Sequence, residues 1–348
     1  MSASNQFGKG SEDFMMRGVQ LIKPGVVEVR DIAVPAADSQ ALVRIKTVGV
    51  CGTDSSIIAG KIPVELPRTM GHEGVGIVEQ AGPLGSVPAG QRVLIDPGIS
   101  CELCDLCRRG YPNLCRNGGL LGRDFDGVFA DFVAVDERQL LLVPDHITDD
   151  EAGLLQVLGT CVHAVATAPV LPGDVAVVLG LGVAGQLFVQ LLARGGAHVI
   201  GITRSPSKRA LAEQLGAAQA VAPEAAGAAV AEATHGRGAN LVFEAVGIEE
   251  TFAQAIELAD HAGTVVLYGT ATGGGSGLPY YQLYFKELTI HNPRAATKSD
   301  YQRAIDLVAT GVIDAAPIVS ARFGLSEARD ALVACGDPST LKVLMHTD

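Results

Sequence analysis

The chain has 348 residues, of which 48% are hydrophobic and 18% charged, as in a globular enzyme that exceeds one typical hydrophobic core, so two domains are expected. The formal net charge of −12 argues against nucleic acid or an anionic membrane as the main partner, since both require a basic face. No apolar run approaches the roughly 18 residues of a membrane span, and no signal-peptide pattern opens the chain, so a cytoplasmic protein is expected.

The first third of the chain has the pattern of an all-β domain. After a polar start of about a dozen residues, which predicts a loose tail, short β-branched runs alternate with Pro and Gly turns to about residue 145. Such spacing is typical of a small barrel. Strands are expected over residues 26–30, 41–46, 75–78 and 92–95.

After about residue 150 the pattern changes to strands that alternate with helices. Residues 175–179 form a continuous apolar run, as expected for a buried parallel strand. A helix should follow, then a strand over 197–203, then a helix that begins at Ser205-Pro206 and ends at Gly216. Further strands are expected over 241–245 and 264–268. This alternation predicts a doubly wound parallel sheet.

The rest of the chain completes the expected division into domains. A surface helix is expected over 223–233 and a flexible glycine-rich loop over 272–277. The tail from about Asn292 ends in an apolar run and should return to the first domain. The predicted domains are therefore residues 1–155 with 293–348, and residues 156–292.

Four cysteines lie close together in the β region, in a segment expected to form a lobe over residues 98–118. Their spacing is Cys101-x2-Cys104-x2-Cys107-x7-Cys115. Four thiolates within 15 residues can close one zinc tetrahedrally and leave no open position, which makes the site structural. Disulfides are the alternative, and they suit a cytoplasmic enzyme poorly. The remaining cysteines outside metal-like places, Cys161 and Cys335, are expected to be ordinary core residues.

A second candidate metal site combines Cys51, in VCGTD, with His72, in GHEGVG. Alone, the pair could equally be a core thiol and a core histidine. Asp54 and Glu73 stand beside the two ligands, where carboxylates can orient them. Thr53 offers a hydroxyl that could pass a proton outward. A Cys/His pair with a weaker third ligand leaves a position for substrate, so this zinc could be catalytic.

A glycine motif follows the strand over 175–179 and opens the next helix. In Gly180-Leu181-Gly182-Val183-Ala184-Gly185 the glycines let the backbone approach a pyrophosphate at the helix N-terminus. About 20 residues on, an Asp or Glu would hold the ribose of NAD. Here the residues are Thr203, Arg204 and Ser205, with Lys208 one turn later, and they suit a 2′-phosphate. The alternative is a solvated, basic helix start.

Taken together, the motifs resemble the zinc-dependent medium-chain alcohol/polyol dehydrogenases. CGTD, GHEGVG, the four-cysteine segment, GLGVAG, FEAVG and a closing LKVL stand in that family's order over nearly the whole chain. The resemblance implies an α/β protein with a GroES-like β-barrel catalytic domain plus a Rossmann doubly wound parallel sheet, and a homodimer or homotetramer. It implies a relay role for Thr53, and cofactor contacts that include Val246, Tyr268 and, at the pyrophosphate, Lys342.

Two positions depart from the family pattern. Many relatives end the proton relay in a histidine where this chain has Ser56, so Ser56, water or the cofactor ribose must take that part. The third zinc ligand, Cys, Asp or Glu in relatives, aligns with the neutral Gln156. An amide oxygen can ligate zinc weakly, and water or Glu73 could complete the site instead.

These observations predict a zinc-dependent oxidoreductase that holds two zinc ions per subunit, prefers NADP(H) to NAD(H) and acts on an alcohol/carbonyl pair. The substrate would be a small secondary alcohol, polyol or cyclitol. Two alternatives stay open: a zinc-independent enoyl or quinone reductase of the same superfold, and a non-catalytic nucleotide-sensing relative. Fold alone does not choose among them.

Overall fold

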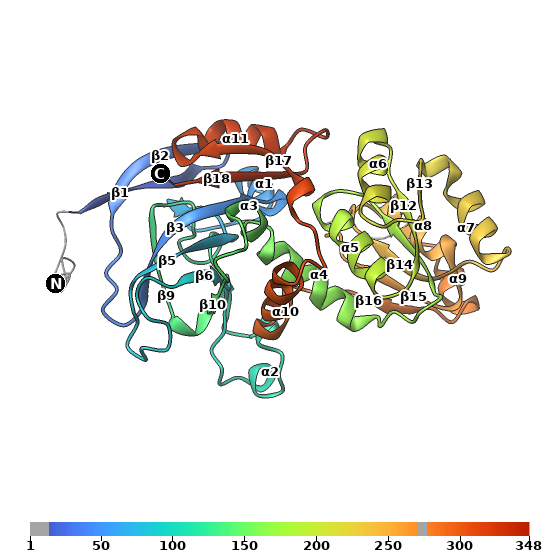
Figure 1. Ribbon diagram of the computed structural model, residues 1–348, viewed down its shortest axis with the longest axis horizontal. Coiled ribbons are helices and arrows are strands. Elements are labelled where there is room, and N and C mark those ends of the chain that lie inside the picture. The colour runs from blue at the N-terminus through green and yellow to red at the C-terminus, as the bar shows by residue number, and fades with distance from the viewer. Residues whose placement is uncertain (1–13, 271–276, 348) are drawn as a thin grey trace. The chain divides into compact units, whose positions relative to one another are not determined.

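The computed structural model describes residues 14–270 and 277–347, and the chain divides into two compact units (Figure 1). The first unit comprises residues 1–156 and 319–348, and the second comprises residues 157–318. The predicted N-terminal tail and most of the predicted loop over 272–277 lie outside the described residues. Among the helices that are described, none has both the length and the apolar character needed to cross a bilayer.

The first unit is mostly β, as the sequence predicts. One sheet has the strand order β10-β6-β5-β3-β18-β17, with β9 also paired to β3, and a smaller sheet has the order β2-β1-β4. The strands are β1 (Met15–Lys23), β2 (Val26–Ala33), β3 (Ala41–Val50), β4 (Arg68–Thr69), β5 (Gly74–Gln80), β6 (Arg92–Ile95), β7 (Gly98–Ile99), β8 (Gly119–Leu120), β9 (Phe132–Val135), β10 (Leu140–Leu142), β17 (Val319–Gly324) and β18 (Lys342–His346). The helices are α1 (Gly52–Ile58), α2 (Asp105–Arg108), α3 (Asp149–Ala152) and α11 (Ala328–Cys335).

The end of the chain completes this unit. β18 pairs antiparallel with β3, so that Val343 lies opposite Val50, and α11 packs along β17 and β18 (Figure 1). Val43 and Ile45 of β3 lie in the main core with Val343 and Met345. Leu42, on the other face of β3, is buried as well, in a small second cluster.

The second unit confirms the predicted doubly wound sheet. Its six strands have the order β13-β12-β11-β14-β15-β16, and all of them pair in parallel. They are β11 (Val175–Leu179), β12 (His198–Ile202), β13 (Gln219–Val221), β14 (Ala239–Glu244), β15 (Ala259–Leu267) and β16 (Thr289–His291). The helices are α4 (Leu155–Thr167), α5 (Val183–Arg194), α6 (Pro206–Gln214), α7 (Ala226–Thr234), α8 (Glu249–Leu258), α9 (Tyr280–Phe285) and α10 (Lys298–Ala309).

Local signals place several boundaries in this unit. The Ser205 hydroxyl caps α6, with Pro206 at its first position, and Gly216 follows the helix with a φ of 118°. The helix predicted over 223–233 begins as a 3-10 turn and continues as α7. It is more than a surface helix, because Ala226 and Val230 are buried in the core of the unit.

The return to the first unit comes later than the predicted residue 293. The chain stays in the second unit until Ile318, and residues of α10 contact residues of α4 there. Tyr301 is buried against the Cα of Gly159, where a methyl group would lie 2.2 Å from the ring. His163 Nδ1 lies 2.9 Å from Asp300 Oδ2. Composition alone does not reveal these contacts between distant segments.

Candidate functional site

Three side chains that can ligate a metal converge at the end of β3. Cys51 follows β3 directly, and His72 and Glu73 precede β5, which pairs with β3. The ligand atoms of these three residues, here called the Cys51 cluster, all lie within 4.8 Å of one another. A thiolate, an imidazole and a carboxylate are a donor set that zinc accepts.

Asp54 contacts both residues predicted to be ligands, Cys51 through its backbone and His72 through its ring. It is fully buried in α1, and its Oδ2 accepts the Cys51 N–H at 2.9 Å. Its Oδ1 lies 3.3 Å from His72 Nδ1, an ion-pair contact rather than a hydrogen bond, which leaves Nε2 for a metal. Burial lowers the pKa of His72, but Asp54 and Cys51 outweigh it and raise that pKa well above its usual value. A metal must therefore displace a proton from this ring.

Glu73 forms an ion pair with Lys342 inside the first unit. Both side chains are 2% exposed, and the Lys342 ammonium also donates to the Val50 carbonyl at 3.3 Å. Burial lowers the pKa of Lys342, yet the attraction of Glu73 and Cys51 raises it overall, so the amine is charged. Gly49 makes room for the pair, because a methyl group there would lie 2.2 Å from Glu73 Oε2. The predicted contact of Lys342 with a pyrophosphate stays a prediction.

The other predicted residues of this site lie on α1 and at the start of α4. The Thr53 N–H donates to Cys51 Sγ at 3.5 Å, and the half-buried side chain of Thr53 follows the candidate ligand. The Ser56 hydroxyl donates to the Gly52 carbonyl at 3.2 Å. Gln156 is buried in the first turn of α4. The relay and the ligand role of Gln156 stay predictions.

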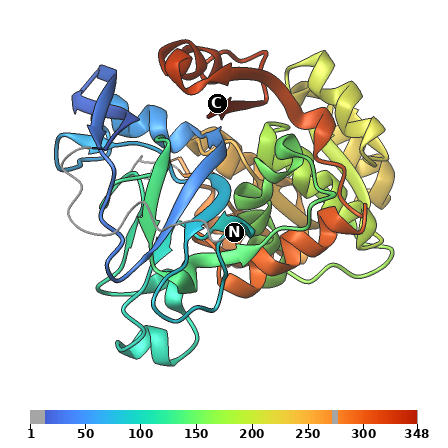
Figure 2. The same cartoon turned by 60° about the vertical axis from the view of Figure 1, so that its left-hand side comes forward.

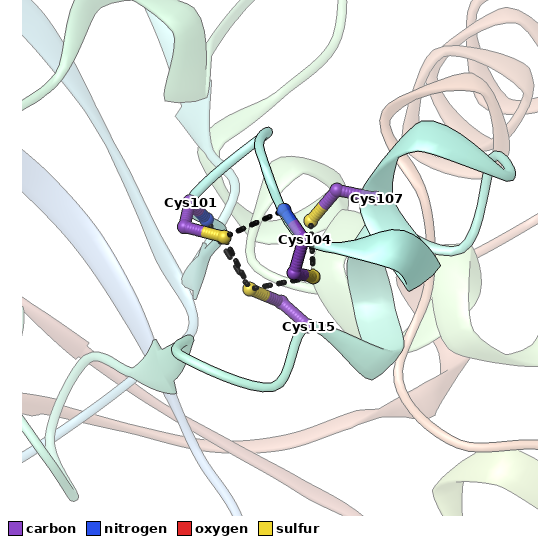
Figure 3. Close-up of side chains that lie close together, drawn as sticks. All are labelled: Cys101, Cys104, Cys107 and Cys115. Atoms are coloured by element: carbon purple, nitrogen blue, oxygen red, sulfur yellow. Dashed lines mark hydrogen bonds between the residues drawn. The ribbon is translucent and has the colours of Figure 1, made fainter.

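The four cysteines of the lobe surround one point (Figure 3). Their sulfurs lie within 4.8 Å of one another, with contacts of 3.5 Å for Cys104–Cys107, 3.9 Å for Cys104–Cys115 and 3.4 Å for Cys115–Cys101. A disulfide needs about 2.05 Å, whereas a zinc tetrahedron with bonds of about 2.3 Å has edges of about 3.8 Å. The donor set therefore fits a closed zinc site. The lobe projects from the rest of its unit (Figures 1 and 2).

The thiols of the lobe differ in acidity. Backbone N–H groups of Arg116 and Cys107 lower the pKa of Cys104 to about 6, while desolvation and the neighbouring thiols raise the pKa of Cys107 to about 12. Four sulfurs this close resist sharing several negative charges without a cation between them. The cluster is thus suited to a divalent metal.

The glycine motif adopts the geometry that a dinucleotide requires. Gly180 has a φ of 91°, and a methyl group on Gly185 would lie 1.9 Å from the Gly180 carbonyl oxygen, so neither tolerates a side chain. A methyl group on Gly182 would meet nothing within 4 Å. Gly182 precedes Val183 and Ala184 of α5 and caps the helix without a side-chain bond, which leaves N–H groups for a phosphate.

The end of β12 carries hydroxyl and cationic groups where an NAD site would carry a carboxylate. Arg204 is exposed and has no side-chain partner among the described residues. Ser205 Oγ accepts the Lys208 N–H at 3.5 Å. The carbonyls of Thr203 and Arg204 are held by Arg209, at 2.8 and 3.0 Å. This donor set fits a 2′-phosphate.

Two further polar residues lie near the ends of β14 and β15: Glu244, the last residue of β14, and Thr160 of α4, which contacts Tyr268 after β15. Glu244 is fully buried, and its Oε1 accepts the N–H groups of Val246 and Gly247 at 2.8 and 2.9 Å. The Thr160 hydroxyl lies 2.8 Å from the Tyr268 hydroxyl. The sequence does mark Glu244, because it is a charged residue within the apolar segment FEAVG, just before Val246-Gly247. Thr160 gives no comparable signal, because its partner is distant in sequence.

Comparison with known proteins agrees with this arrangement. The family model for the alcohol dehydrogenase GroES-like domain matches residues 37–145, and that for the zinc-binding dehydrogenase domain matches residues 183–310. L-galactonate-5-dehydrogenase of Escherichia coli is 30% identical over 300 residues, which are 84% of this chain and 87% of that protein. The chain belongs to the zinc-type alcohol dehydrogenase family. As a member it is an oxidoreductase with a GroES-like and a Rossmann domain, as the resemblance implied.

Other members of the family are similar over nearly the whole chain. The 2-dehydro-3-deoxy-L-galactonate 5-dehydrogenase of Pseudoalteromonas atlantica is 29% identical and covers 92% of this chain and 95% of its own. A zinc-binding dehydrogenase from Sinorhizobium meliloti, solved with NADP bound, is 35% identical at a TM-score of 0.90. The match covers 96% of this chain and 99% of that protein. An alcohol dehydrogenase from a Thermus species is 29% identical at a TM-score of 0.89, with 96% and 100% covered.

Proposed function

We propose that this dehydrogenase is zinc-dependent, prefers NADP(H), and transfers hydride between that cofactor and an alcohol/carbonyl pair. The observation that carries the proposal is the Cys51 cluster, in which a thiolate, an imidazole and a carboxylate lie within 4.8 Å beside the buried Asp54. The exposed Arg204, in a position where an NAD enzyme would have a carboxylate, supports the cofactor preference.

The substrate we propose is a secondary hydroxyl of a polyol or related sugar compound. The names of relatives support this class, since they include enzymes of L-galactonate and of 2-dehydro-3-deoxy-L-galactonate. A cyclitol or simple secondary alcohol belongs to the same chemical class. The assembly expected from the resemblance, a dimer or tetramer, stays a prediction.

The residues of the chain supply positioning and proton transfer. Zinc, when bound, supplies a Lewis acid that favours the alkoxide form of an alcohol near neutral pH. Asp54 orients His72 through Nδ1, so the ring presents Nε2 in a fixed direction. Thr53 takes the substrate proton outward. The Ser56 hydroxyl already donates to the Gly52 carbonyl, so Ser56 can continue the relay only as an acceptor or through water.

Metal analysis separates this proposal from its main alternative. A zinc-independent enoyl or quinone reductase needs neither Cys51 nor His72, and would hold only the zinc of the four-cysteine lobe. The proposed enzyme would hold two zinc ions per subunit, one at each cluster. A non-catalytic nucleotide-sensing protein would bind the cofactor and turn over no alcohol or ketone. The neutral Gln156 is the feature that favours this last alternative.

Replacing Arg204 by Ala should weaken NADP(H) far more than NAD(H). Charge-assisted hydrogen bonds to the 2′-phosphate are lost, so the Kd for NADPH should rise roughly ten- to hundredfold, while that for NADH changes little. Thr203→Asp with Arg204→Ile should move the preference towards NAD(H), by restoring a carboxylate. Fluorescence titration of both cofactors measures the change. An equal loss for both cofactors, or a wild-type preference for NADH, would refute the assignment.

Replacing Gln156 by Glu should tighten zinc retention at the Cys51 cluster. If Gln156 rather than Glu73 is the third ligand beside Cys51 and His72, one thiolate and two neutral groups give the zinc site a net charge of about +1. A carboxylate in place of the Gln156 amide would make the site neutral. We expect a chelator to remove this zinc from the wild type while that of the lobe stays, and Gln156→Glu to slow the loss on the order of tenfold. Zinc in the neutral site of Gln156→Glu would be a weaker Lewis acid, so the pKa seen in the pH–rate profile should rise.

The matched control is Gln214→Glu, which makes the same charge change at an exposed position of α6. It should alter neither zinc loss nor the pH–rate profile. If Gln156→Glu also leaves both unchanged, Gln156 is not a ligand, and water or Glu73 completes the site.

A further inference from the structure

Two hydroxyl groups at the carboxyl edge of the parallel sheet form a hydrogen bond whose donor can be assigned. Thr160 Oγ1 lies 2.7 Å from the Val157 carbonyl oxygen and 2.8 Å from the Tyr268 hydroxyl. A carbonyl can only accept, so the single proton of Thr160 is donated to Val157. Tyr268 must therefore be the donor to Thr160. The bond ties α4 to the residue that follows β15.

The surroundings of this hydroxyl pair hold it beside the glycine motif. The Tyr268 ring packs edge-on against Phe188 of α5, with centroids 5.0 Å apart and an interplanar angle of 88°. Cys161, next to Thr160, has its Sγ 3.9 Å from the Ala184 carbonyl oxygen in the first turn of α5. The pair thus lies at the N-terminal end of α5, on the edge where a dinucleotide binds.

Strand order indicates which half of the dinucleotide reaches the pair. The order β13-β12-β11-β14-β15-β16 reverses between β11 and β14, and a dinucleotide spans that switch point. Arg204 follows β12 and fits the 2′-phosphate of the adenosine half. The nicotinamide half must then extend over the ends of β14 and β15. Val246, which follows β14, is 47% exposed there and offers apolar surface to a ring.

We propose that Tyr268 and Thr160 form a positioning pair for the nicotinamide half of the cofactor. Tyr268 acts through Thr160. The Tyr268 hydroxyl holds the Thr160 side chain, and with it the first turns of α4, against the strand ends on which the nicotinamide riboside lies. The inference rests on the proposed function only in that the cofactor is a nicotinamide dinucleotide. Removing the Tyr268–Thr160 bond should therefore weaken the binding of the nicotinamide half and leave the binding of the adenosine half unchanged.

The test compares the whole cofactor with its adenosine half. Kd values for NADPH and for adenosine 2′,5′-bisphosphate are measured for the wild type, Tyr268→Phe, Thr160→Val and the double variant. Each single variant should weaken NADPH roughly three- to tenfold and leave the bisphosphate unchanged. The double variant should be no worse than the worse single variant, because both remove the same bond. Tyr284→Phe on α9, where Tyr284 is 84% exposed, should change neither affinity.

Two results would overturn the positioning role. One is an unchanged Kd for NADPH in Tyr268→Phe. The other is an equal loss for NADPH and the bisphosphate, which is what a merely structural bond would produce. If the wild type binds NADH in preference, the NADP assignment fails, and NADH measured against adenosine 5′-monophosphate then decides the role of the pair. A wild type that binds no dinucleotide overturns both proposals.

Discussion

Replacing Cys104 by Ser should release the zinc of the four-cysteine lobe and unfold the lobe locally. The lobe has little core of its own: α2 contains no buried residue, and Leu103 is 71% exposed. We therefore expect a bound zinc to keep the lobe ordered, since binding to four thiolates contributes on the order of 10 kcal/mol in small zinc domains. Zinc content should fall by one ion per subunit, and proteolysis within residues 98–118 should become rapid.

The matched control is Cys335→Ser, at a half-buried cysteine outside both metal clusters. It should leave the zinc content and the proteolysis pattern unchanged. A Cys104→Ser protein that keeps its lobe zinc, or that loses zinc from the Cys51 cluster instead, would contradict the structural assignment.

Replacing Lys342 by Met should destabilise the first unit by roughly 3–5 kcal/mol. Lys342 and Glu73 are each 2% exposed, so the change leaves the Glu73 carboxylate buried without its cation. Methionine has nearly the same length, so lost packing is a minor cause. The loss of stability can be measured by hydrogen exchange in urea. The amides to observe are those of β3 and β18, the two strands that pair beside this site.

The double variant Lys342→Met with Glu73→Gln separates charge from packing. A neutral amide needs no cation, so most of the lost stability should return. The comparison is made on chelated protein, so that zinc cannot compensate for the missing ammonium. A double variant as unstable as Lys342→Met alone would show that packing, not charge, sets the loss.

The features that the sequence predicted well depend on local chemistry. The glycine motif is recognisable because Gly180 and Gly185 meet within a single turn. The start of α6 follows from Ser205 and Pro206 alone. The four cysteines of the lobe lie within 15 residues, so their spacing already restricts them to one metal.

The features that the sequence left open depend on contacts between distant residues. Lys342 and Glu73 are 269 positions apart, and nothing in LKVL or GHEGVG indicates that they pair. The contact of Tyr301 with Gly159 keeps α10 in the second unit and moves the predicted boundary. Glu73, expected to orient a ligand, lies within ligand distance itself, a matter of side-chain geometry. The predicted ligand role of Gln156 likewise depends on side-chain geometry, which the sequence does not give.

The most direct measurement of the central claim is nicotinamide absorbance during turnover of a panel of secondary alcohols, polyols and sugar acids. The wild type should reduce NADP⁺ faster than NAD⁺ with at least one of them. Cys51→Ser should abolish that turnover, because the change removes a predicted metal ligand. The variant should keep the wild-type affinity for NADPH, because Cys51 lies outside the second unit. Turnover that survives in Cys51→Ser, or no turnover of any alcohol or carbonyl by a wild type that binds NADPH, would contradict the account.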